Sequence, residues 1–373
     1  MKDRIYICHT FYHVYISCLK ERLHSQECQA SPQAAIVLSL MSTDFGDLKI
    51  RLEASGLFSE VFEYDEKRGT FFPALKKYQR NSGNIIFHMI NRMIFTKKLG
   101  KAQIPFLPTD FHDYQNIYVF CDSDPIGYYL NYAKIPYHAI EDGLNCLVIF
   151  DAAHYDNHKY FRFKAWMSAR NLIFIQNGYG KYCLDMEVND ISVLENPGPN
   201  FVERSREEMV SRLDEKSVAV LLAIFVGDME KLKRKLAERC HSQPKILILT
   251  EPLGDVEVRG ELFFKIIDRY GQCKGKEAQI FIKPHPMDIV DYQTLFPDYI
   301  VLDGKFPMEI LNLIPDLYFD RVISVFTVPS GIKIAGEIIS LGRGFEVDPL
   351  DPRPLIEKLS EYVEGIFLSN EGK

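Results

Sequence analysis

The stretch Gln279-Ile280-Phe281-Ile282-Lys283-Pro284-His285-Pro286 is a short apolar run that ends in a proline-rich turn. The run predicts a buried strand, because parallel strands that are covered on both faces are apolar along their whole length. Similar runs recur along the chain and alternate with longer stretches of helical periodicity. This β-α-β-α order predicts an α/β fold with mostly parallel sheets and helices on both faces.

The predicted strands fall into two groups, separated by the densest cluster of proline, glycine and asparagine, Glu195–Asn200. In the first group they are Arg4–Thr10, Ala34–Leu40, Val61–Tyr64, Asn116–Cys121, His138–Ile140 and Asn171–Ile175. In the second group they are Lys245–Leu249, Gln279–Lys283, Tyr299–Leu302, Arg321–Val325 and Glu337–Leu341, after predicted helices at Glu203–Leu213 and Val218–Cys240. We therefore predict two Rossmann-like domains, residues 1–200 and 201–373, that face a central cleft.

The composition narrows the class of protein. The chain has 373 residues with 44 Lys and Arg against 51 Asp and Glu, a net charge of −7, which argues against a general nucleic-acid binder. Its eight cysteines are scattered without a CxxC pair, which predicts reduced thiols and neither a zinc site nor disulfides. No signal peptide or membrane-spanning run is evident, so we expect a cytoplasmic protein.

The Lys283-Pro284-His285-Pro286 turn is the first candidate for chemistry. Two prolines stiffen the turn and fix the direction of the imidazole. A histidine beside a lysine can then donate a hydrogen bond or a proton to a phosphate. The structural alternative is a histidine that caps a tight turn.

The second candidate is Glu141-Asp142-Gly143, which follows a predicted strand. The glycine permits a sharp turn, and repulsion between adjacent carboxylates raises one pKa, as a general base needs. The alternative is a solvated acidic turn.

Two further segments that follow predicted strands are also candidate sites, whereas two other segments give weaker evidence for a site. The hydroxyls and the glycine of the segment 324–331 suit phosphate binding at a helix start, or simply cap that helix. The segment Cys8–His13 offers polar and aromatic side chains that could hold a sugar, although His13 could equally be a helix-start histidine. We assign no metal to Asp122-Ser123-Asp124. For the basic helix Glu230–Arg239 we favour a solvent-exposed face over a membrane-binding patch.

Together these segments resemble the bacterial sialyltransferases of glycosyltransferase family 52, the lipooligosaccharide sialyltransferases, with the polysialyltransferases as relatives. The matching segments are Ile7–His13, Glu141–Gly143, Leu249–Leu253, Lys283–Pro286 and residues 324–330. Glu251 stands where the family pattern has glutamine, and Val328 follows Thr327 where a second hydroxyl is usual. The resemblance implies a GT-B fold and inverting transfer of sialic acid from CMP-sialic acid, with no metal or other cofactor.

The resemblance also implies roles for single residues. Glu141 or Asp142 would be the catalytic base, with Asp255 as the alternative, and His285 would meet the CMP phosphate. The donor-binding residues would be Lys283, Pro286, Ser324, Thr327, Ser330, Thr250 and Glu251. The acceptor-binding residues would be His9, Thr10, Tyr12 and His13.

The expected partners are a nucleotide-sugar donor and a galactoside-type acceptor of a cell-surface glycan, a lipooligosaccharide or a capsule. Peripheral contact with the inner face of the membrane and a homodimer stay open. So do two other functions: transfer of another sugar or of glycerol phosphate from a nucleotide donor, and non-catalytic binding of a sugar nucleotide or glycan.

Overall fold

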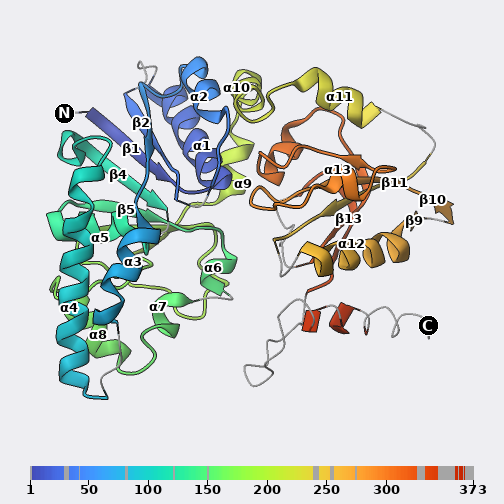
Figure 1. Ribbon diagram of the computed structural model, residues 1–373. Helices are drawn as coiled ribbons and strands as arrows, with labels where there is room; N and C mark the ends of the chain where they lie inside the picture. The colour runs from blue at the N-terminus through green and yellow to red at the C-terminus, as the bar shows by residue number, and fades with distance from the viewer. Residues whose placement is uncertain are drawn as a thin grey trace. The chain divides into compact units, whose positions relative to one another are not determined.

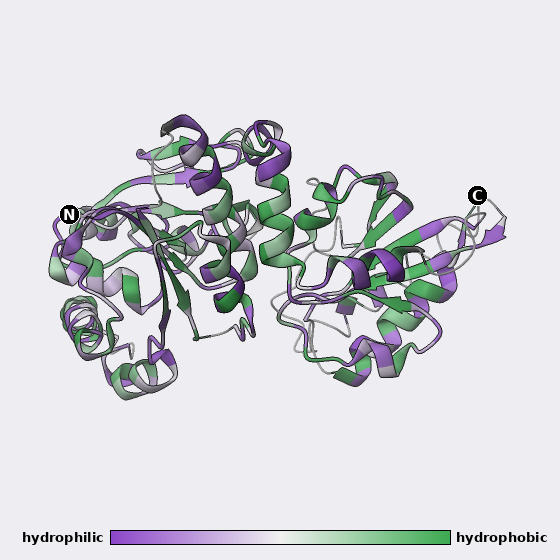
Figure 2. Ribbon diagram, turned by 90° about the horizontal axis from the view of Figure 1, so that it is seen from above, coloured by the Kyte–Doolittle hydropathy of each residue, from purple (hydrophilic) through white to green (hydrophobic). Residues whose placement is uncertain are grey.

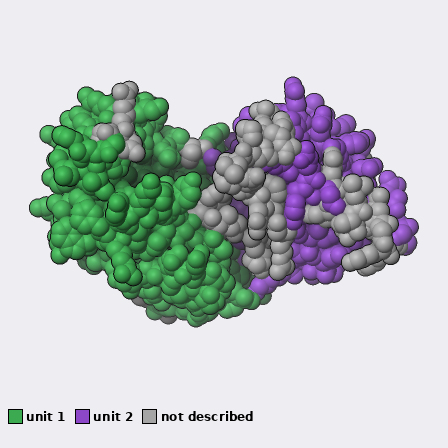
Figure 3. Space-filling view, turned by 90° about the horizontal axis from the view of Figure 1, so that it is seen from below, with its two compact units in different colours: residues 1–220 green, residues 221–373 purple. Residues whose placement is uncertain are grey.

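The computed structural model describes residues 2–28, 33–41, 43–79, 83–120, 122–148, 151–237, 243–252, 256–273, 275–325 and 332–342, with 358–359, 361–363 and 365 near the C-terminus. The chain divides into two compact units, residues 1–220 and 221–373, which Figure 3 colours separately. Each unit is an α/β structure built on a sheet of parallel strands (Figure 1).

The first unit contains a seven-stranded sheet in the order β3-β2-β1-β4-β5-β6-β7, and every neighbouring pair is parallel. Its strands are β1 (Lys2–Cys8), β2 (Ala34–Ser39), β3 (Glu60–Tyr64), β4 (Tyr114–Phe120), β5 (Tyr137–Ile140), β6 (Cys183–Val188) and β7 (Phe201–Glu203). The carboxyl ends of these strands therefore meet along one edge of the sheet, where open α/β sheets bind their ligands.

Helices cover both faces of this sheet. They are α1 (Phe11–Cys28), α2 (Leu48–Ser55), α3 (Arg68–Leu75), α4 (Ile85–Ala102), α5 (Pro125–Ala133), α6 (Asn145–Val148), α7 (Ala152–Tyr155), α8 (Phe161–Ser168) and α9 (Arg206–Ser211), with the 3₁₀ turns η1 (Lys76–Tyr78), η2 (Ile104–Phe106) and η3 (Phe111–Asp113). Alternate residues of β1 serve the two faces, since the Tyr6 hydroxyl bonds to Glu21 of α1 while Ile5 and Ile7 pack with α5.

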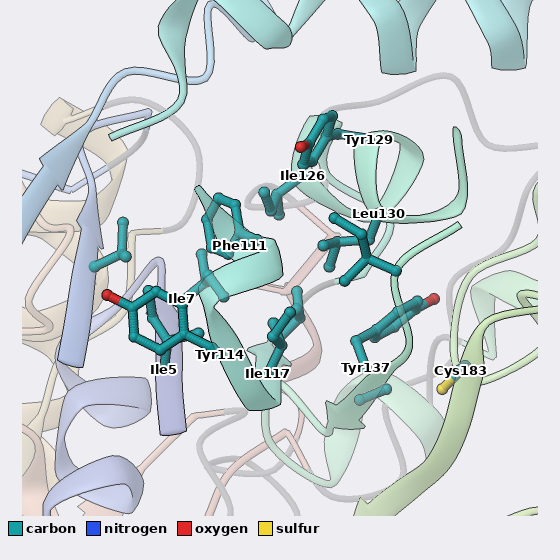
Figure 4. Packing of buried hydrophobic residues seen from close by; sticks show 14 of the residues in the cluster. Ile5, Ile7, Phe111, Tyr114, Ile117, Ile126, Tyr129, Leu130, Tyr137 and Cys183 are labelled. Atoms are coloured by element: carbon teal, nitrogen blue, oxygen red, sulfur yellow. The ribbon is translucent and has the colours of Figure 1, made fainter. Parts of the chain in front are cut away.

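One part of the core of the first unit lies between the sheet and α5. Figure 4 shows Ile5, Ile7 and Ile117 of the sheet against Ile126 and Leu130 of α5. All five side chains are buried. Burial of such side chains stabilises a fold by about 1.5–3 kcal/mol each. The apolar residues of these strands therefore stabilise the packing of the sheet against α5.

The second unit has a five-stranded parallel sheet in the order β12-β11-β8-β13-β14. Its strands are β8 (Lys245–Leu249), β11 (Gln279–Lys283), β12 (Ile300–Val301), β13 (Phe319–Ser324) and β14 (Ala335–Ser340), and β9 (Gln272–Cys273) pairs separately with β10 (Lys276–Glu277). Its helices include α11 (Met229–Ala237), α12 (Val256–Tyr270), α13 (Tyr292–Leu295) and the 3₁₀ helix η4 (Met308–Leu313). In Figure 2 the strands of both sheets are largely green, the colour of hydrophobic residues.

The α/β class predicted from the sequence is confirmed, and three details differ. The predicted strand Asn171–Ile175 is wrong: Ile173 and Ile175 are buried in a small core with α4 and α8, outside the sheet. The predicted helix Val218–Cys240 is two helices, α10 (Glu215–Phe225) and α11, interrupted at Gly227. The units divide after Val220 and not after residue 200, because β7 follows the proline-rich cluster and pairs with β6 of the first sheet.

Within the described ranges, no helix combines the length and the hydropathy that a bilayer crossing requires.

Candidate functional site

Polar side chains gather at the carboxyl ends of the strands of the first unit. His9 follows β1 directly, and His13 lies in the first turn of α1. Glu66 follows β3, Asp124 follows β4 and Asp142 follows β5. Hydrogen bonds and ion pairs join these residues, so segments far apart in the sequence form one polar cluster.

His13 and Asp142 are the first pair of this cluster. The His13 ring is completely buried and stacks on Phe120, with centroids 4.3 Å apart and planes 10° apart. Its Nδ1 accepts a hydrogen bond from the backbone N–H of His9 at 3.0 Å. Burial lowers the pKa of His13, although Asp142 opposes that shift. His13 is therefore neutral with its proton on Nε2, and Nε2–H donates to Oδ1 of Asp142.

Glu141 and Asp142 have different environments although they are adjacent. The Glu141 residue is 1% exposed, and its Oε2 accepts from the backbone N–H of Asn189 at 3.0 Å. Burial raises the pKa of Glu141, and the nearby Arg206 limits the rise. The Asp142 side chain is 35% exposed. Of the two acids predicted as alternative bases, only Asp142 can therefore reach a bound molecule from solvent.

His9 is the second histidine of the cluster and has the opposite charge behaviour. Its Nε2 lies 2.5 Å from Oε1 of Glu66 and 3.6 Å from Oδ2 of Asp124. Burial disfavours the charged ring, but Glu66, Asp124 and Asp142 outweigh it and raise the pKa of His9 to about 9. Glu66 is fully buried and also accepts from the Ser39 hydroxyl at 2.9 Å and the Ile126 N–H at 2.9 Å. His9 is thus a buried cation held by carboxylates.

The predicted acceptor-binding residues all lie in this part of the first unit. The His9 and His13 rings are buried and bonded to carboxylates, while the Thr10 hydroxyl accepts from the backbone N–H of His13 at 3.2 Å, as a helix cap does. Thr10 and Tyr12 are partly exposed. A direct contact of the two histidine rings with a sugar would require these rings to become accessible, and acceptor binding by the four residues stays a prediction.

The two aspartates of Asp122-Ser123-Asp124 have separate partners. Asp122 accepts from the backbone N–H groups of Asn177 at 2.7 Å and Gly178 at 3.3 Å, and from the Tyr137 hydroxyl at 3.2 Å. Asp124 pairs with Arg68 at 3.2 Å. Among the described residues, no group of three or more His, Cys, Asp or Glu side chains is arranged to hold a metal ion. Metal-independent activity remains a prediction.

In the second unit, the predicted site residues lie in and around the turn that follows β11. The backbone N–H of His285 donates to the Thr250 hydroxyl at 3.1 Å, and His285 Nδ1 accepts from the Met287 N–H at 3.2 Å. Burial, followed by the charge of Lys283, lowers the pKa of His285 to about 4. The ring is therefore neutral near pH 7, with the proton on Nε2. It can donate a hydrogen bond to an anion.

Asp288 holds this turn in place through hydrogen bonds. Its Oδ2 accepts from the Thr250 hydroxyl at 3.1 Å and the Tyr292 hydroxyl at 2.8 Å, and its Oδ1 pairs with Arg259. The Asp288 side chain is fully buried. Thr250, which was predicted to bind the donor, is 2% exposed and links Asp288 to His285. Its hydroxyl positions the histidine in this arrangement.

Lys283 is also buried, at the end of β11. Its Nζ donates to the carbonyl oxygens of Pro284 at 2.9 Å and Gly304 at 3.1 Å, and lies 4.4 Å from the centre of the Phe306 ring. Burial lowers the pKa of Lys283 to about 7, against the opposing effect of Asp303 and Glu309. An anion at the turn would favour the charged form of this lysine.

The remaining predicted site residues are only partly described. Glu251 and Ser324 are buried beside β8 and at the end of β13, and Pro286 is partly exposed in the turn. Thr327, Ser330 and the alternative base Asp255 lie outside the described residues. Glu66 and Asp288 were not predicted. Each is one acid among 51 in the sequence, and only the fold brings it beside its histidine or threonine.

Three solved structures with a similar fold are bacterial sialyltransferases. A 2,6-sialyltransferase of Photobacterium sp. JT-ISH-224, in complex with CMP and lactose, has a TM-score of 0.58 at 11% identity, covering 98% of this chain and 76% of that one. The GT-B domain of a Photobacterium damselae sialyltransferase has a TM-score of 0.54 at 14% identity, covering 99% and 97%. An α/β-galactoside α-2,3-sialyltransferase of Photobacterium phosphoreum has a TM-score of 0.53 at 12% identity, covering 98% and 95%. The fold is that of GT-B glycosyltransferases, as the sequence predicts.

The sequence comparison identifies the family to which the chain belongs. The family description "Glycosyltransferase family 52" matches residues 91–334, and the chain belongs to this family. The predicted class, a glycosyltransferase, is thereby confirmed. An uncharacterised protein of Haemophilus influenzae is 29% identical over 121 residues, a match that spans 31% of this chain and 35% of that protein.

Proposed function

We propose that this protein is an inverting sialyltransferase that moves sialic acid from CMP-sialic acid to a galactoside-type acceptor of a cell-surface glycan. Membership of family 52 supports the class of reaction. The similar 2,6-sialyltransferase was solved with CMP and lactose, which supports this choice of donor and acceptor.

The observation that carries the proposal is the hydrogen bond from His13 to Asp142. It fixes the orientation of a charged, partly exposed carboxylate at the carboxyl end of a parallel strand. In the reaction, Asp142 takes the proton of an acceptor hydroxyl while that oxygen forms a bond to the anomeric carbon of sialic acid. The bond from this carbon to the phosphate oxygen breaks, and its electron pair leaves with CMP. Attack from the face opposite the leaving group inverts the anomeric configuration.

His285 stabilises the leaving group, CMP. Its neutral ring donates Nε2–H to the phosphate as negative charge develops on CMP. The phosphate in turn favours protonation of the ring and of Lys283, because an adjacent anion raises the pKa of both groups. None of these steps uses a metal ion, so we expect a chelator to leave the rate unchanged.

The test measures CMP release from CMP-sialic acid with and without lactose, in the wild type and in Asp142→Asn. The asparagine keeps the shape of the side chain but cannot accept the proton. We expect acceptor-dependent kcat/KM to fall roughly 10²–10⁴-fold, the usual contribution of a general base. Binding of CMP, measured by calorimetry, should stay within about twofold.

The matched control is Asp185→Asn. Asp185 also pairs with a histidine, His138, at 2.9 Å, and its side chain is 31% exposed. This variant should retain near-normal turnover. Equal losses in the two variants, or full activity in Asp142→Asn, would remove Asp142 from the mechanism. Release of CMP that lactose never accelerates would contradict the proposed acceptor class.

A further inference from the structure

The basic residues of the chain are unevenly distributed. The stretches 67–109 and 157–184 contain 14 lysines and arginines and not one Asp or Glu, although the rest of the chain has 30 basic against 51 acidic residues. These stretches form α3, η1, α4, η2 and α8 of the first unit. An acidic protein therefore has one strongly basic group of helices.

The first turns of α4 expose large apolar side chains in this basic region. Ile85, Ile86, Phe87 and Ile90 are 49%, 67%, 61% and 45% exposed. The opposite face of the helix is the one used in folding, since Met89 and its neighbour Met93 pack with Met167 of α8. The fold therefore leaves the outer face of α4 without an apolar partner among the described residues.

Helix α8, next to α4, exposes aromatic side chains. Phe163 and Trp166 are each about half exposed and their rings stack, with centroids 5.9 Å apart and planes 13° apart. The Arg170 guanidinium lies 4.0 Å from the centre of the Trp166 ring. Because the beginning of α4 shares a small core with α8, both exposed sets lie at the same end of the first unit (Figure 1), the end toward the viewer in Figure 3.

We propose that this surface, which we call the basic apolar end, docks onto a bilayer that contains anionic lipid. It comprises Ile85, Ile86, Phe87 and Ile90 of α4, Phe163 and Trp166 of α8, and the exposed Lys159, Arg162 and Arg170. Aliphatic and aromatic side chains insert at the level of the lipid headgroups, and lysine and arginine bind the negative surface. Tryptophan is enriched at such interfaces.

Charge argues against a second copy of the chain as the occupant. A two-fold interface would bring the same lysines and arginines against themselves, and like charges repel. A nucleic acid would satisfy the basic residues but would leave the exposed isoleucines of α4 without a partner.

Helix α11, the basic helix singled out in the sequence, has a different arrangement. Its Leu232 and Leu236 are buried in the second unit, Lys233 pairs with Glu230, and Lys235 donates to the carbonyl oxygen of Val301. It is basic and exposed but presents no apolar anchor, and it therefore provides a matched control.

Trp166 is the only tryptophan of the chain, so its fluorescence reports on the basic apolar end alone. The experiment adds vesicles of phosphatidylcholine, with or without one third phosphatidylglycerol, to the full-length protein. We expect a blue shift of Trp166 emission, quenching by lipids brominated in the acyl chain, and co-sedimentation, all with the phosphatidylglycerol vesicles and all weakened by salt.

Two double variants distinguish charge from apolar insertion, and a third serves as the control. K159E/R162E should weaken vesicle binding by at least about 30-fold, since each basic residue near the surface contributes about fivefold and the two glutamates add repulsion. I86S/F87S should weaken it roughly tenfold or more through lost apolar burial. The charge-matched control K231E/R234E on α11 should bind vesicles within about twofold of the wild type. All changed side chains are exposed, and melting curves verify that each variant is folded.

Three outcomes would overturn the proposal. The first is equal binding to both kinds of vesicle, or none. The second is a loss in K231E/R234E as large as that in K159E/R162E. The third is a shift of Trp166 emission that depends on protein concentration or on an added oligonucleotide and not on lipid, which would assign the surface to a second copy or to a nucleic acid. None of these readouts needs enzyme activity, so they are independent of the proposed transfer.

Discussion

The strand ends of the two units hold their histidines in different ways. In the first unit the partners are distant in sequence: His13 and Asp142 are 129 residues apart, and His9 and Glu66 are 57 apart. In the second unit His285 is held by the next turn of backbone and by Thr250 of the neighbouring strand end. One site is assembled by the fold, and the other is largely a local turn.

The acids around each ring decide its charge. Carboxylates raise the pKa of His9 to about 9 despite burial, while burial lowers the pKa of His13 and lowers that of His285 to about 4. Three buried or half-buried histidines thus have one cationic and two neutral rings near pH 7. The surrounding acids, and not the depth of burial, separate His9 from the other two.

Of the changes that test this contrast between the two units, removal of Glu66 should have the largest effect, and it acts on stability. In Glu66→Ala the charged His9 loses its closest carboxylate, and Ser39 and the Ile126 N–H lose their acceptor. Breaking one side of a buried ion pair costs about 3–5 kcal/mol, which denaturant unfolding of the variant can measure. Glu63→Ala, which changes an exposed acid at the end of β3, should change the free energy of unfolding by less than about 0.5 kcal/mol. A Glu66→Ala variant as stable as Glu63→Ala would show that His9 is not a buried cation.

The same pair predicts a pH dependence of stability. Because the folded pKa of His9 is raised to about 9 from 6.5, its contribution is fully present below pH 6.5 and is lost as the pH rises through about 9. Glu66→Gln removes the charge but keeps hydrogen-bonding capacity, so this alkaline loss should shift toward pH 6.5. An unchanged profile in Glu66→Gln would assign the alkaline loss to another group.

His285→Ala should have the next largest effect, and it acts on the reaction. Loss of one donor to the developing charge of CMP should lower kcat/KM about 10²–10³-fold. Since the pKa of His285 is lowered to about 4, the ring is already neutral above about pH 5, and kcat/KM of the wild type should show no fall from this group up to about pH 8. The control His138→Ala changes a histidine that lies within β5. A wild-type fall near pH 6.5 that disappears only in His285→Ala would mean that the free enzyme needs a charged ring.

The contrast also explains what the sequence could predict. Strands such as Lys245–Leu249 and Gln279–Lys283 were predicted to the residue, because a buried parallel strand is a continuous apolar run and the turn residues are next to it. Asn171–Ile175 is a similar apolar run but packs with α4 and α8, an outcome that depends on tertiary contacts. Glu66 could not be predicted for the same reason, since nothing in its local sequence distinguishes it from the exposed Glu63.

Asp122→Ala tests a smaller part of the first unit. The sequence assigns no metal to this residue, and in the structure Asp122 accepts two backbone N–H groups and the Tyr137 hydroxyl. Their loss should destabilise the protein by about 2–3 kcal/mol in thermal or denaturant unfolding. The exposed Asp113→Ala should be neutral. If Asp122→Ala instead abolishes turnover in a protein of normal stability, and Mn²⁺ affects the wild type, a metal role would replace this structural one.

Thr250→Val should have the smallest effect and tests the local character of the second site. Valine keeps the shape of threonine but removes the hydroxyl that accepts from the His285 N–H and donates to Asp288. Asp288 retains Tyr292, Arg259 and the Val290 N–H, so the free energy of unfolding should fall by only about 1 kcal/mol. If Thr250 positions His285, kcat should fall several-fold while KM for CMP-sialic acid changes little, and Thr250→Ser should restore kcat. A rise in KM with unchanged kcat would instead return Thr250 to the role predicted from the sequence, direct contact with the donor.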